Sequence, residues 1–460
     1  MTAATHRTAE EIGRTEQGPR PLPPLGDQRA AADLSHVDTV LGNGLRVLAV
    51  RKANVPLIEF RLWIPFAGDD RMHPARAEVL AETLFTGTVR RDRVGVDTEL
   101  ALIGGDISAG VDPERLIISG NALSSGLPTL LDVVADSLTG ASYVDAEVAR
   151  EKERLIERIS IARTQPRTIA REALQKHRYG NHPATFETPE ATDVTEVTPA
   201  EVRALHTASV LPRGAALVIV GDIDPQQVVA DIEKALSGWV SDASAVRLPA
   251  LPELAGGPVL LVPRPGAVQS QIRLSAQALP RTDPGYAALQ LANLAFGGYF
   301  SSRLVENLRE DKGYTYSAHS GFEFTDQTAT VNIDADTASP ATAAALLETR
   351  YELGRLALVP PTKDEVESVR QYAIGSLVTS TSSQAGLARQ LTALVSNGLG
   401  LDWLAEHPTR LAQVTGEDVE KAALAYFGPK RFTGVIVGDA DLLAEKLTAV
   451  GDVTVGDPTV

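Results

Sequence analysis

Short apolar runs and amphipathic segments alternate along the chain. Residues 45–50 and 57–64 are rich in branched aliphatic and aromatic side chains and predict two strands joined by a turn. From Pro74 to Phe85 apolar residues recur with helical spacing, and Pro74 suits the first turn of a helix. The same patterns predict strands at 106–111, 115–119 and 217–221, and helices at 127–138, 145–162 and from Pro225 onward. Such mixing predicts an α+β fold with helices packed on mostly antiparallel sheets.

An internal repeat divides the chain into two similar halves. The sequence VIVGDID at 218–224 returns as VIVGDAD at 435–441, and VTPAEV at 197–202 returns as VTGEDV, in both cases 217 residues later. LAETLFTG at 80–87 also resembles LANLAFGG, which lies 211 residues further on. Matches separated by nearly the same number of residues indicate a duplicated structural unit rather than chance similarity of apolar patterns.

The repeat sets the expected domain organisation. We expect a first domain at residues 36–240 and a second, homologous domain at 258–460. Residues 241–257 are rich in Pro, Gly and Ala and are typical of a linker. Residues 1–35 contain several prolines and charges but no apolar stretch, so we expect a disordered lead-in.

Composition narrows the classes of function. The formal net charge of −16 disfavours binding to nucleic acid or to anionic membranes. The absence of cysteine excludes disulfides, thiolate metal sites and cysteine nucleophiles. The N-terminal stretch carries Glu10, Glu11 and Glu16 and does not resemble a signal peptide, so a cytoplasmic location is expected.

Several motifs occur in the order found in one peptidase family. They are LGNGLRVL at 41–48, Gly221-Asp222 after a buried strand, PGAVQS at 265–270, SSRL at 301–304 and LREDKGYTY at 308–316. Together they resemble the insulinase-type (M16) metallopeptidases, of the M16B type, over nearly all of the chain after residue 36. The resemblance implies two homologous halves with the M16 peptidase-like (LuxS/MPP-like) fold.

The zinc motif of that family is degenerate in this chain. Active members carry H-x-x-E-H on the first helix, with two His ligands one helical turn apart and a Glu acting as general base. The aligned positions hold Glu78, Ala81 and Glu82, and the later ligand position falls on Glu157. Both His ligands and the base are therefore missing, and no metal is expected in this chain. His177 and His182 are the only neighbouring histidines, and we expect them in a surface loop.

Two interpretations of the three glutamates stay open at this point. Glu78, Glu82 and Glu157 could hold a hard cation, because Mg²⁺ and Ca²⁺ prefer carboxylate oxygens. Alternatively they form a solvated helix face, which we favour. Without a base at Ala81, even a bound cation would support hydrolysis poorly.

A second family feature is retained. Arg309 and Tyr316 stand seven residues apart around Gly313, within the SSRL and GYTY context. The resemblance implies that they form the family's Arg/Tyr pair, which completes the zinc site of another first half. A Tyr hydroxyl can donate to the oxyanion, and an Arg can hold a substrate carbonyl.

The resemblance therefore predicts a division of labour between two chains. We expect the non-zinc-binding subunit of a heterodimeric M16B peptidase, in which Arg309 and Tyr316 act in trans on a partner that carries zinc and H-x-x-E-H. Leader-peptide removal and oligopeptide turnover both fit as tasks. The alternative is a catalytically inert structural or peptide-binding protein of the same fold. The segment 104–111, where the family's substrate strand would lie, is treated as structural.

Overall fold

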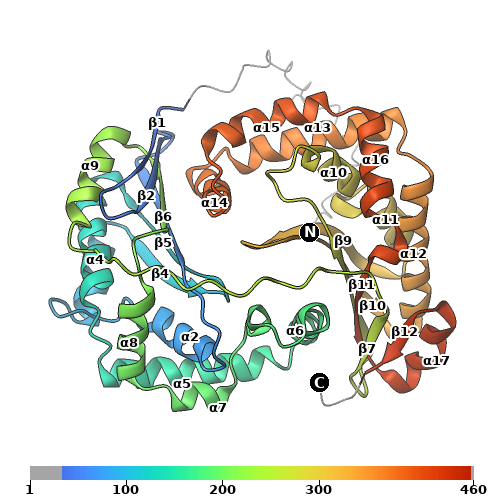
Figure 1. The fold of residues 1–460 in the computed structure, drawn as a ribbon, viewed down its shortest axis with the longest axis horizontal. Helices are drawn as coiled ribbons and strands as arrows, with labels where there is room; N and C mark the ends of the chain where they lie inside the picture. Colours follow the sequence, from blue (N-terminus) through green and yellow to red (C-terminus); the bar gives the residue numbers. More distant parts are fainter. Residues whose placement is uncertain (1–33, 457–460) are drawn as a thin grey trace, which may run out of the picture. The chain divides into compact units, whose positions relative to one another are not determined.

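The computed structural model describes residues 34–456, so the lead-in predicted at 1–35 lies, up to residue 33, outside the described residues. Two six-stranded sheets, each with packed helices, organise these residues (Figure 1). The first sheet has the order β1-β2-β6-β3-β5-β4 and is antiparallel except where β2 pairs with β6. Its strands are β1 (His36–Val40), β2 (Arg46–Arg51), β3 (Leu57–Pro65), β4 (Asp106–Val111), β5 (Arg115–Leu123) and β6 (Ala216–Gly221).

The second sheet repeats this arrangement. Its order is β12-β7-β11-β8-β10-β9, with β8, β10 and β9 antiparallel to their neighbours. The strands are β7 (Val259–Pro263), β8 (Gln269–Gln277), β9 (Thr315–Phe324), β10 (Ala329–Ala338), β11 (Thr433–Gly438) and β12 (Val453–Val455). The predicted α+β class with two homologous halves is confirmed. The exact domain bounds stay a prediction.

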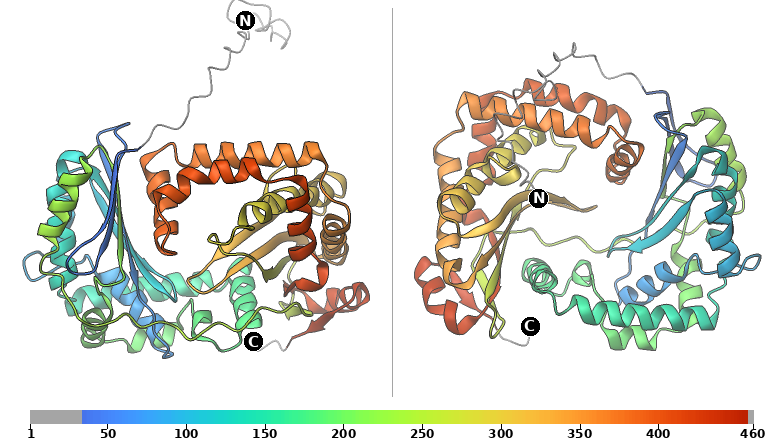
Figure 2. Two further views of the ribbon diagram at one scale, coloured as in Figure 1. Left: turned by 45° about the horizontal axis from the view of Figure 1, so that its top comes forward. Right: turned by 180° about the vertical axis from the view of Figure 1, so that it is seen from behind.

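Helices cover the sheets in both halves (Figure 2). Those before the second sheet are α2 (His73–Thr83), α3 (Arg93–Leu102), α4 (Leu127–Gly140), α5 (Asp145–Ala162), α6 (Pro166–Tyr179), α7 (Ala191–Glu196), α8 (Pro199–Ser209) and α9 (Pro225–Ala235). Those after β8 in the chain are α10 (Tyr286–Asn293), α11 (Arg303–Val305), α12 (Thr342–Leu358), α13 (Lys363–Ser380), α14 (Gln384–Val395), α15 (Leu401–Gln413), α16 (Gly416–Tyr426) and α17 (Ala440–Val450). Two π-helical turns, η3 (Leu294–Gly298) and η4 (Glu306–Asp311), lie among them.

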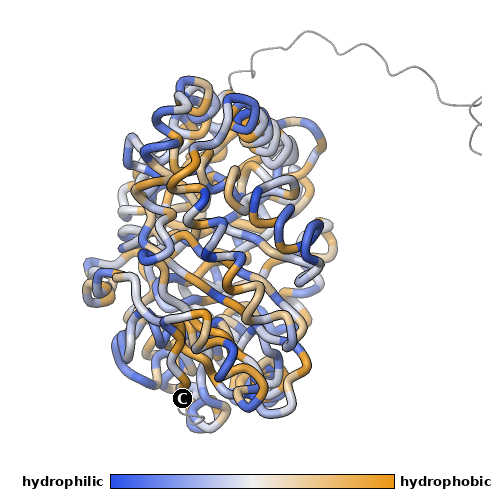
Figure 3. The backbone as a smooth tube through the Cα atoms, turned by 90° about the vertical axis from the view of Figure 1, so that its right-hand side faces the viewer, coloured by the Kyte–Doolittle hydropathy of each residue, from blue (hydrophilic) through white to orange (hydrophobic). Residues whose placement is uncertain are grey.

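Each half buries its own hydrophobic core. In the first, Phe60 and Leu62 of β3 pack with Leu80 and Leu84 at the C-terminal end of α2. In the second, Phe296 packs with core residues of the sheet and of the covering helices. Hydrophilic and hydrophobic residues alternate along many of the helices (Figure 3), as expected for helices with one buried face. Among the described residues, no helix is long and apolar enough to cross a membrane.

Helix α6 is among the helices that the sequence patterns did not predict. His177 was expected in a surface loop, but it lies in α6, where its Nε2 is 2.8 Å from Thr433 Oγ1 of β11. The expectation for His177 was wrong because α6 is rich in charged residues and has only a narrow apolar face. Pro166 begins the helix, and Gly180, with φ of +60°, ends it.

The repeat becomes visible as a reciprocal exchange of helices. Helix α6 packs on β11 and β8 of the second sheet, whereas α14 packs on β6 and β3 of the first (Figure 1). Adding the repeat offset of 217 residues to α6 gives a segment that overlaps α14, and adding it to β6 gives β11. The two contacts are therefore equivalent, and each half completes its packing with a helix from the other.

Polar anchors fix both exchanged helices. Arg178, near the end of α6, has a side chain only 2% exposed and donates to Glu323 of β9 at 3.0 Å, and also to Ser275. Gln384, at the start of α14, donates through Nε2 to the carbonyl oxygens of Lys52 and Val55 at 2.6 and 3.0 Å. Buried polar groups with several partners specify one docking geometry, because a shifted helix would leave them unsatisfied.

Removal of the α6 anchor should destabilise the whole protein. Arg178→Ala leaves Glu323 and its neighbours without their buried donor, so we expect a loss of about 3 kcal/mol in the free energy of unfolding. Arg150→Ala is the control, because Arg150 forms a half-exposed pair with Glu147 and should cost below about 1 kcal/mol. Urea unfolding measures both. Equal losses in the two variants would contradict the anchoring role.

Candidate functional site

Helix α2 carries the positions where the first half would hold a metal. Pro74 occupies its first turn, and Glu78 and Glu82 lie one turn apart with side chains 25% and 31% exposed. Ala81 lies between them and is buried. The two carboxylates thus share one face of the helix, as the sequence predicted, and the alanine between them offers no group that could take up a proton.

An arginine reaches these carboxylates from the neighbouring helix. Arg158 of α5 donates to Glu82 Oε1 at 2.6 Å, and its Nη2 lies 3.9 Å from Glu78 Oε2. Glu157, the predicted third position, is exposed on α5 and makes no hydrogen bond or ion pair within residues 34–456. The guanidinium therefore supplies positive charge to the pair of carboxylates, and Glu157 does not join them.

Burial changes the protonation of Glu78. Loss of solvent raises the pKa of Glu78 to about 7, against the opposing effect of Arg158, and the nearby Glu82 raises it further. Glu78 is thus partly protonated near neutral pH. A carboxyl group in that state is a weak metal ligand, because a proton competes for the same oxygen atoms.

The residues at this position do not fit zinc. Neither imidazole ligand is present, the base position is an alanine, and Arg158 already pairs with Glu82. No three His, Asp or Glu side chains in the described part of the chain are grouped so that they could hold a metal ion. The hard-cation interpretation of Glu78, Glu82 and Glu157 gains no support, because Arg158 is the cation that these carboxylates face.

The second half brings Arg309 and Tyr316 together. Arg309 lies in η4, Gly313 turns the chain with φ of +63°, and Tyr316 follows at the start of β9. The Arg309 guanidinium carbon lies 5.3 Å from the centre of the Tyr316 ring. This helix–turn–strand arrangement is the one that the sequence context indicated, and it makes the two side chains neighbours.

A β-bulge turns Tyr316 outward. The register between β9 and β10 shifts so that Tyr316 and Ser317 together face the single residue Asp336. Thr315 fixes the bulge, since its hydroxyl donates to Asp336 O at 2.6 Å and accepts from Ser317 N. The Tyr316 side chain is 87% exposed, and its hydroxyl makes no hydrogen bond within the described chain. The phenol is therefore free to donate to a ligand.

Arg309 is held by aromatic contacts rather than by a buried ion pair. Its guanidinium lies 4.6 Å from the centre of the Phe300 ring as well as against Tyr316. One carboxylate is near, Glu310 at 3.4 Å from Nε, and Glu310 is itself more than half exposed. The terminal Nη groups make no hydrogen bond among residues 34–456, so they too can donate to a ligand.

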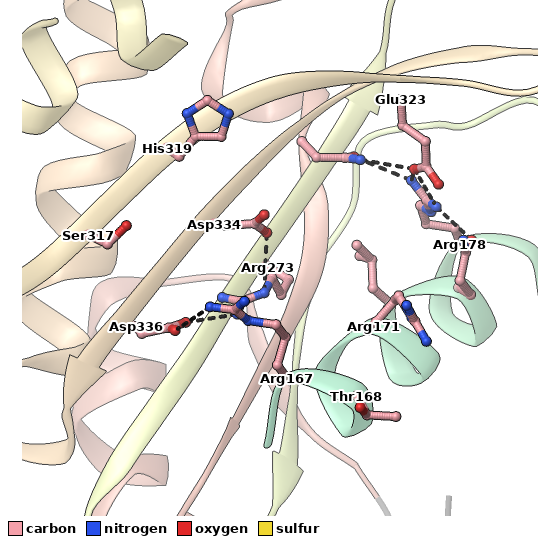
Figure 4. Close-up of a pocket in the computed structure, with 13 residues that line it drawn as sticks. Arg167, Thr168, Arg171, Arg178, Arg273, Ser317, His319, Glu323, Asp334 and Asp336 are labelled. Carbon is pink, nitrogen blue, oxygen red and sulfur yellow. Dashed lines mark hydrogen bonds and ion pairs between the residues drawn. The ribbon is translucent and has the colours of Figure 1, made fainter. Parts of the chain in front are cut away.

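A polar cavity of about 570 Å³ lies next to the bulge that carries Tyr316. Figure 4 shows the residues that line it. Ser317 and His319 line it from β9, Asp334 and Asp336 from β10, and Arg167, Arg171 and Arg178 from α6. Tyr316 is the chain neighbour of Ser317 and opposes Asp336 across the bulge. The Arg/Tyr pair therefore stands next to a space between the second sheet and the helix donated by the first half.

Most charges in this cavity are paired with one another. Arg273 lies 2.8 Å from Asp336 and 3.2 Å from Asp334, and Arg178 pairs with Glu323 (Figure 4). Arg167 approaches Asp336 at 3.9 Å. Since positive and negative groups balance locally, the cavity offers hydrogen bonds without a strong preference for ligands of one charge.

Comparison with known proteins decides the family. The family model described as insulinase (peptidase family M16) matches residues 76–190, and that described as the peptidase M16 inactive domain matches residues 196–372. Together the two matches span most of the chain and extend into both halves of the repeat. The chain belongs to peptidase family M16.

Relatives and solved structures agree with the M16 assignment. An uncharacterized zinc protease of Streptomyces coelicolor is 26% identical over 331 residues, covering 69% of this chain and 70% of the relative. An uncharacterized zinc protease of Mycobacterium bovis is 24% identical, covering 78% and 79%. The crystal structure of a peptidase M16 inactive domain from Pseudomonas fluorescens has a TM-score of 0.80 at 21% identity, covering 88% of this chain and 98% of that one.

Sequence reasoning missed three features of the candidate site. Arg158 directly follows Glu157, yet nothing in the helical pattern indicated that it would turn toward α2. Phe300 immediately precedes the SSRL motif and could have been suspected as an aromatic residue near Arg309. The cavity residues of α6 could not be found, because that helix was not predicted.

The zinc content of the purified protein tests the conclusion that the residues of α2 do not bind zinc. We expect the purified chain to retain well below one zinc per chain after dialysis, because imidazole ligands are missing. The combined variant Glu78→His, Ala81→Glu, Glu82→His and Arg158→Ala restores the family ligands beside Glu157 and should retain about one zinc per chain. Elemental analysis measures both. One tightly held zinc in the unmodified chain would contradict the account.

The raised pKa of Glu78 predicts a pH effect on stability. In the unfolded chain Glu78 ionises near its ordinary pKa, whereas the folded protein keeps the proton until about pH 7. Folding is therefore favoured at low pH, and this contribution is lost as the pH rises toward 7. Relative to the unmodified protein, Glu78→Gln should gain about 1–2 kcal/mol between pH 5 and 8.

Glu157→Gln is the matched control for this test, because Glu157 is exposed on the adjacent helix. It should change the free energy of unfolding by less than about 0.5 kcal/mol across the same pH range. Urea unfolding at each pH gives both curves. A constant difference between Glu78→Gln and the unmodified protein would show that Glu78 ionises normally.

Proposed function

We propose that the chain is the non-zinc-binding subunit of a heterodimeric M16 peptidase. In this proposal Arg309 and Tyr316 act in trans at the zinc site of a partner subunit that carries H-x-x-E-H, and the pair together cleaves peptides. The observation that carries the proposal is the contrast between the two halves. One half has lost its metal ligands, whereas the other presents an Arg/Tyr pair whose donor groups are free.

The chemistry of the pair supports a role at a scissile peptide bond. An exposed phenol with no internal hydrogen bond can donate to the oxyanion that develops on the attacked carbonyl. The guanidinium can donate to a main-chain carbonyl of the same peptide and hold it in place. Tyr316 is 87% exposed and turned outward by a bulge, so its ring contributes little to packing and its hydroxyl faces solvent.

The state of α2 supports action in trans. Arg158 pairs with Glu82, and Ala81 cannot accept a proton, so this first half offers neither metal nor base. The Arg/Tyr pair then needs the metal of another chain to take part in hydrolysis. Relatives named zinc proteases are consistent with such a metal-bearing partner within the same family.

One further relative supports assembly from unlike subunits. The alpha subunit of the mitochondrial-processing peptidase of Solanum tuberosum is 27% identical over 160 residues, which cover 34% of this chain and 31% of that subunit. By its name, that protein works as one subunit of a peptidase. We extend this arrangement to the present chain, with peptides such as leader peptides or free oligopeptides as substrates.

The decisive test mixes this chain with an H-x-x-E-H homologue and follows cleavage of a fluorogenic peptide. Neither chain alone should be active, and the mixture should be. Tyr316→Phe removes only the hydroxyl and should lower kcat about 10²–10³-fold, as removal of an oxyanion donor does. Arg309→Ala should lower kcat/KM by a similar factor, because a charge-assisted contact is lost.

Tyr351→Phe is the matched control, because Tyr351 is 57% exposed on α12 and removal of its hydroxyl should leave the activity of the mixture unchanged. If the mixture is active and remains so with both Tyr316→Phe and Arg309→Ala, the proposed role of the pair is wrong. If no H-x-x-E-H homologue forms an active mixture, the chain acts instead as an inert structural or peptide-binding member of the family.

A further inference from the structure

A second cavity, of about 630 Å³, lies between the first sheet and the exchanged helix α14. Its floor comes from β3 and β5, through residues that include Trp63, Ile117 and Ser119, and its opposite wall comes from the end of α13 and from α14. The cavity exists only because α14 crosses from the second half to the first. Its composition differs sharply from that of the cavity beside Tyr316.

The lining of this cavity is basic. It includes Arg61, Arg115 and Arg389 together with several Ser and Thr hydroxyls, and it contains no aspartate or glutamate. Such a surface is unusual in a chain whose formal net charge is −16. A concave wall that carries only positive charge and hydroxyl donors favours an anionic ligand.

One of the three arginines is free to bind a ligand. Arg61 pairs with Glu59 at 2.7 Å and also donates to two carbonyl oxygens, and Arg115 pairs with Asp112. Arg389 is exposed on α14 and makes no hydrogen bond or ion pair within the described residues. Its guanidinium is therefore the uncompensated charge of the cavity.

The start of α14 adds a second source of positive potential. Ala385 and Gly386 of the first turn line the cavity. The Gly386 N–H donates to the Ser383 hydroxyl at 3.0 Å, whereas the Ala385 N–H makes no hydrogen bond within the described residues. Gln384 anchors the turn by donating to the carbonyl oxygens of Lys52 and Val55. The helix end is thus held rigidly over the sheet, which lowers the entropic cost of binding there.

A buried donor without a partner points to the same cavity. Trp63 lines it, is 5% exposed, and its indole Nε1 has no hydrogen-bond partner within residues 34–456. Buried Trp N–H groups usually find an acceptor, and one left unsatisfied costs stability. The nitrogen has almost no accessible surface, so a ligand or a water would satisfy it only after the neighbouring side chains move.

The cavity lies on a face of the sheet that an extended peptide paired with the edge strand would share. Ile117 and Ser119 of β5 are the register partners of Gly110 and Ser108 in β4, so these four residues share one face of the sheet. Strand β4 is the edge of that sheet. A peptide pairing with β4 would direct alternate side chains to the cavity face.

We propose that this cavity binds a carboxylate of the peptide substrate, with Arg389 as its main partner. One unpaired guanidinium and one helix N-terminus match a single negative charge better than a polyanion. The carboxylate belongs to an aspartate or glutamate side chain or to the C-terminus of the peptide. That the ligand is a peptide rests on the proposed function. The binding of a carboxylate is inferred from the residues of this chain alone.

The test measures binding to the purified chain without any partner subunit. Three fluorescein-labelled peptides of one sequence are compared by anisotropy. The first has a central glutamate and a C-terminal amide, the second has glutamine and a free C-terminus, and the third has glutamine and an amide. We expect whichever carboxylate fits the cavity to bind about tenfold more tightly than the neutral peptide, as one charge-assisted contact would provide.

Variants decide whether the cavity is responsible. Arg389→Ala should reduce the preference to less than about twofold. Arg431→Ala is the control, because Arg431 is also exposed and unpaired but lies near β11, outside this cavity, and it should retain the preference. The preference should also weaken with added salt, since exposed charges are screened.

The results of this binding test can be distinguished from the results of the mixing assay for Arg309 and Tyr316. If the three peptides bind equally, or if the preference survives Arg389→Ala, the carboxylate site is overturned whatever the mixing assay shows. If the glutamate peptide alone is preferred, the side chain is the source of the carboxylate, and if only the free C-terminus is preferred, the peptide end is. Inactivity of the mixture with a positive binding result would overturn the trans role and leave the carboxylate site standing.

Discussion

The reciprocal docking of α6 and α14 is the contact on which the rest of the structure depends. Each half places one helix on the sheet of the other, and buried polar groups fix both contacts: Arg178 against Glu323, and Gln384 against the carbonyl oxygens of Lys52 and Val55. This exchange joins the two halves and at the same time forms the walls of both cavities. One cavity has α6 over the second sheet beside Tyr316, and the other has α14 over the first sheet beside Trp63. A loss of either helix contact would therefore affect stability and ligand binding together.

The two halves differ in the chemistry of the residues at the candidate site positions. In the first, an arginine takes the role of counter-charge to carboxylates that stand where metal ligands would be, and the base position is a buried alanine. In the second, aromatic contacts with Phe300 and Tyr316 hold Arg309 without burying its donors. Arg158 balances part of the negative charge at the first position, whereas the second position exposes donors that are free to bind a ligand. This asymmetry is what the proposed partnership with a zinc-bearing chain explains.

Much of the fold could be predicted from sequence because strong local patterns coincide with the repeat. The helix expected at 145–162 is α5 with the same bounds, and the strand pair around Asp112 is β4 and β5. Placement of Arg309 and Tyr316 as neighbours followed from the short helix–Gly313–strand segment. Helix α6 escaped prediction because its apolar residues, such as Ala170 and Leu174, are few and pack on the other half. Arg158 contacts Glu82 between two helices of the first half, and the basic cavity at Arg389 forms between α14 and the first sheet. Both depend on tertiary packing that no local pattern encodes.

The most direct test of the central claim is the proximity of β9 to the partner's metal. The chain contains no cysteine, so Ser317→Cys creates a unique position for a nitroxide spin label beside Tyr316. The labelled chain is mixed with an H-x-x-E-H homologue whose zinc has been exchanged for paramagnetic Co²⁺, and a label at Arg431→Cys serves as the distant reference. If Arg309 and Tyr316 act in trans, the Co²⁺ should broaden the electron paramagnetic resonance spectrum of the label at residue 317 far more than that at residue 431. Equal spectra with Co²⁺ and Zn²⁺ at residue 317, in a complex that has formed, would contradict the account.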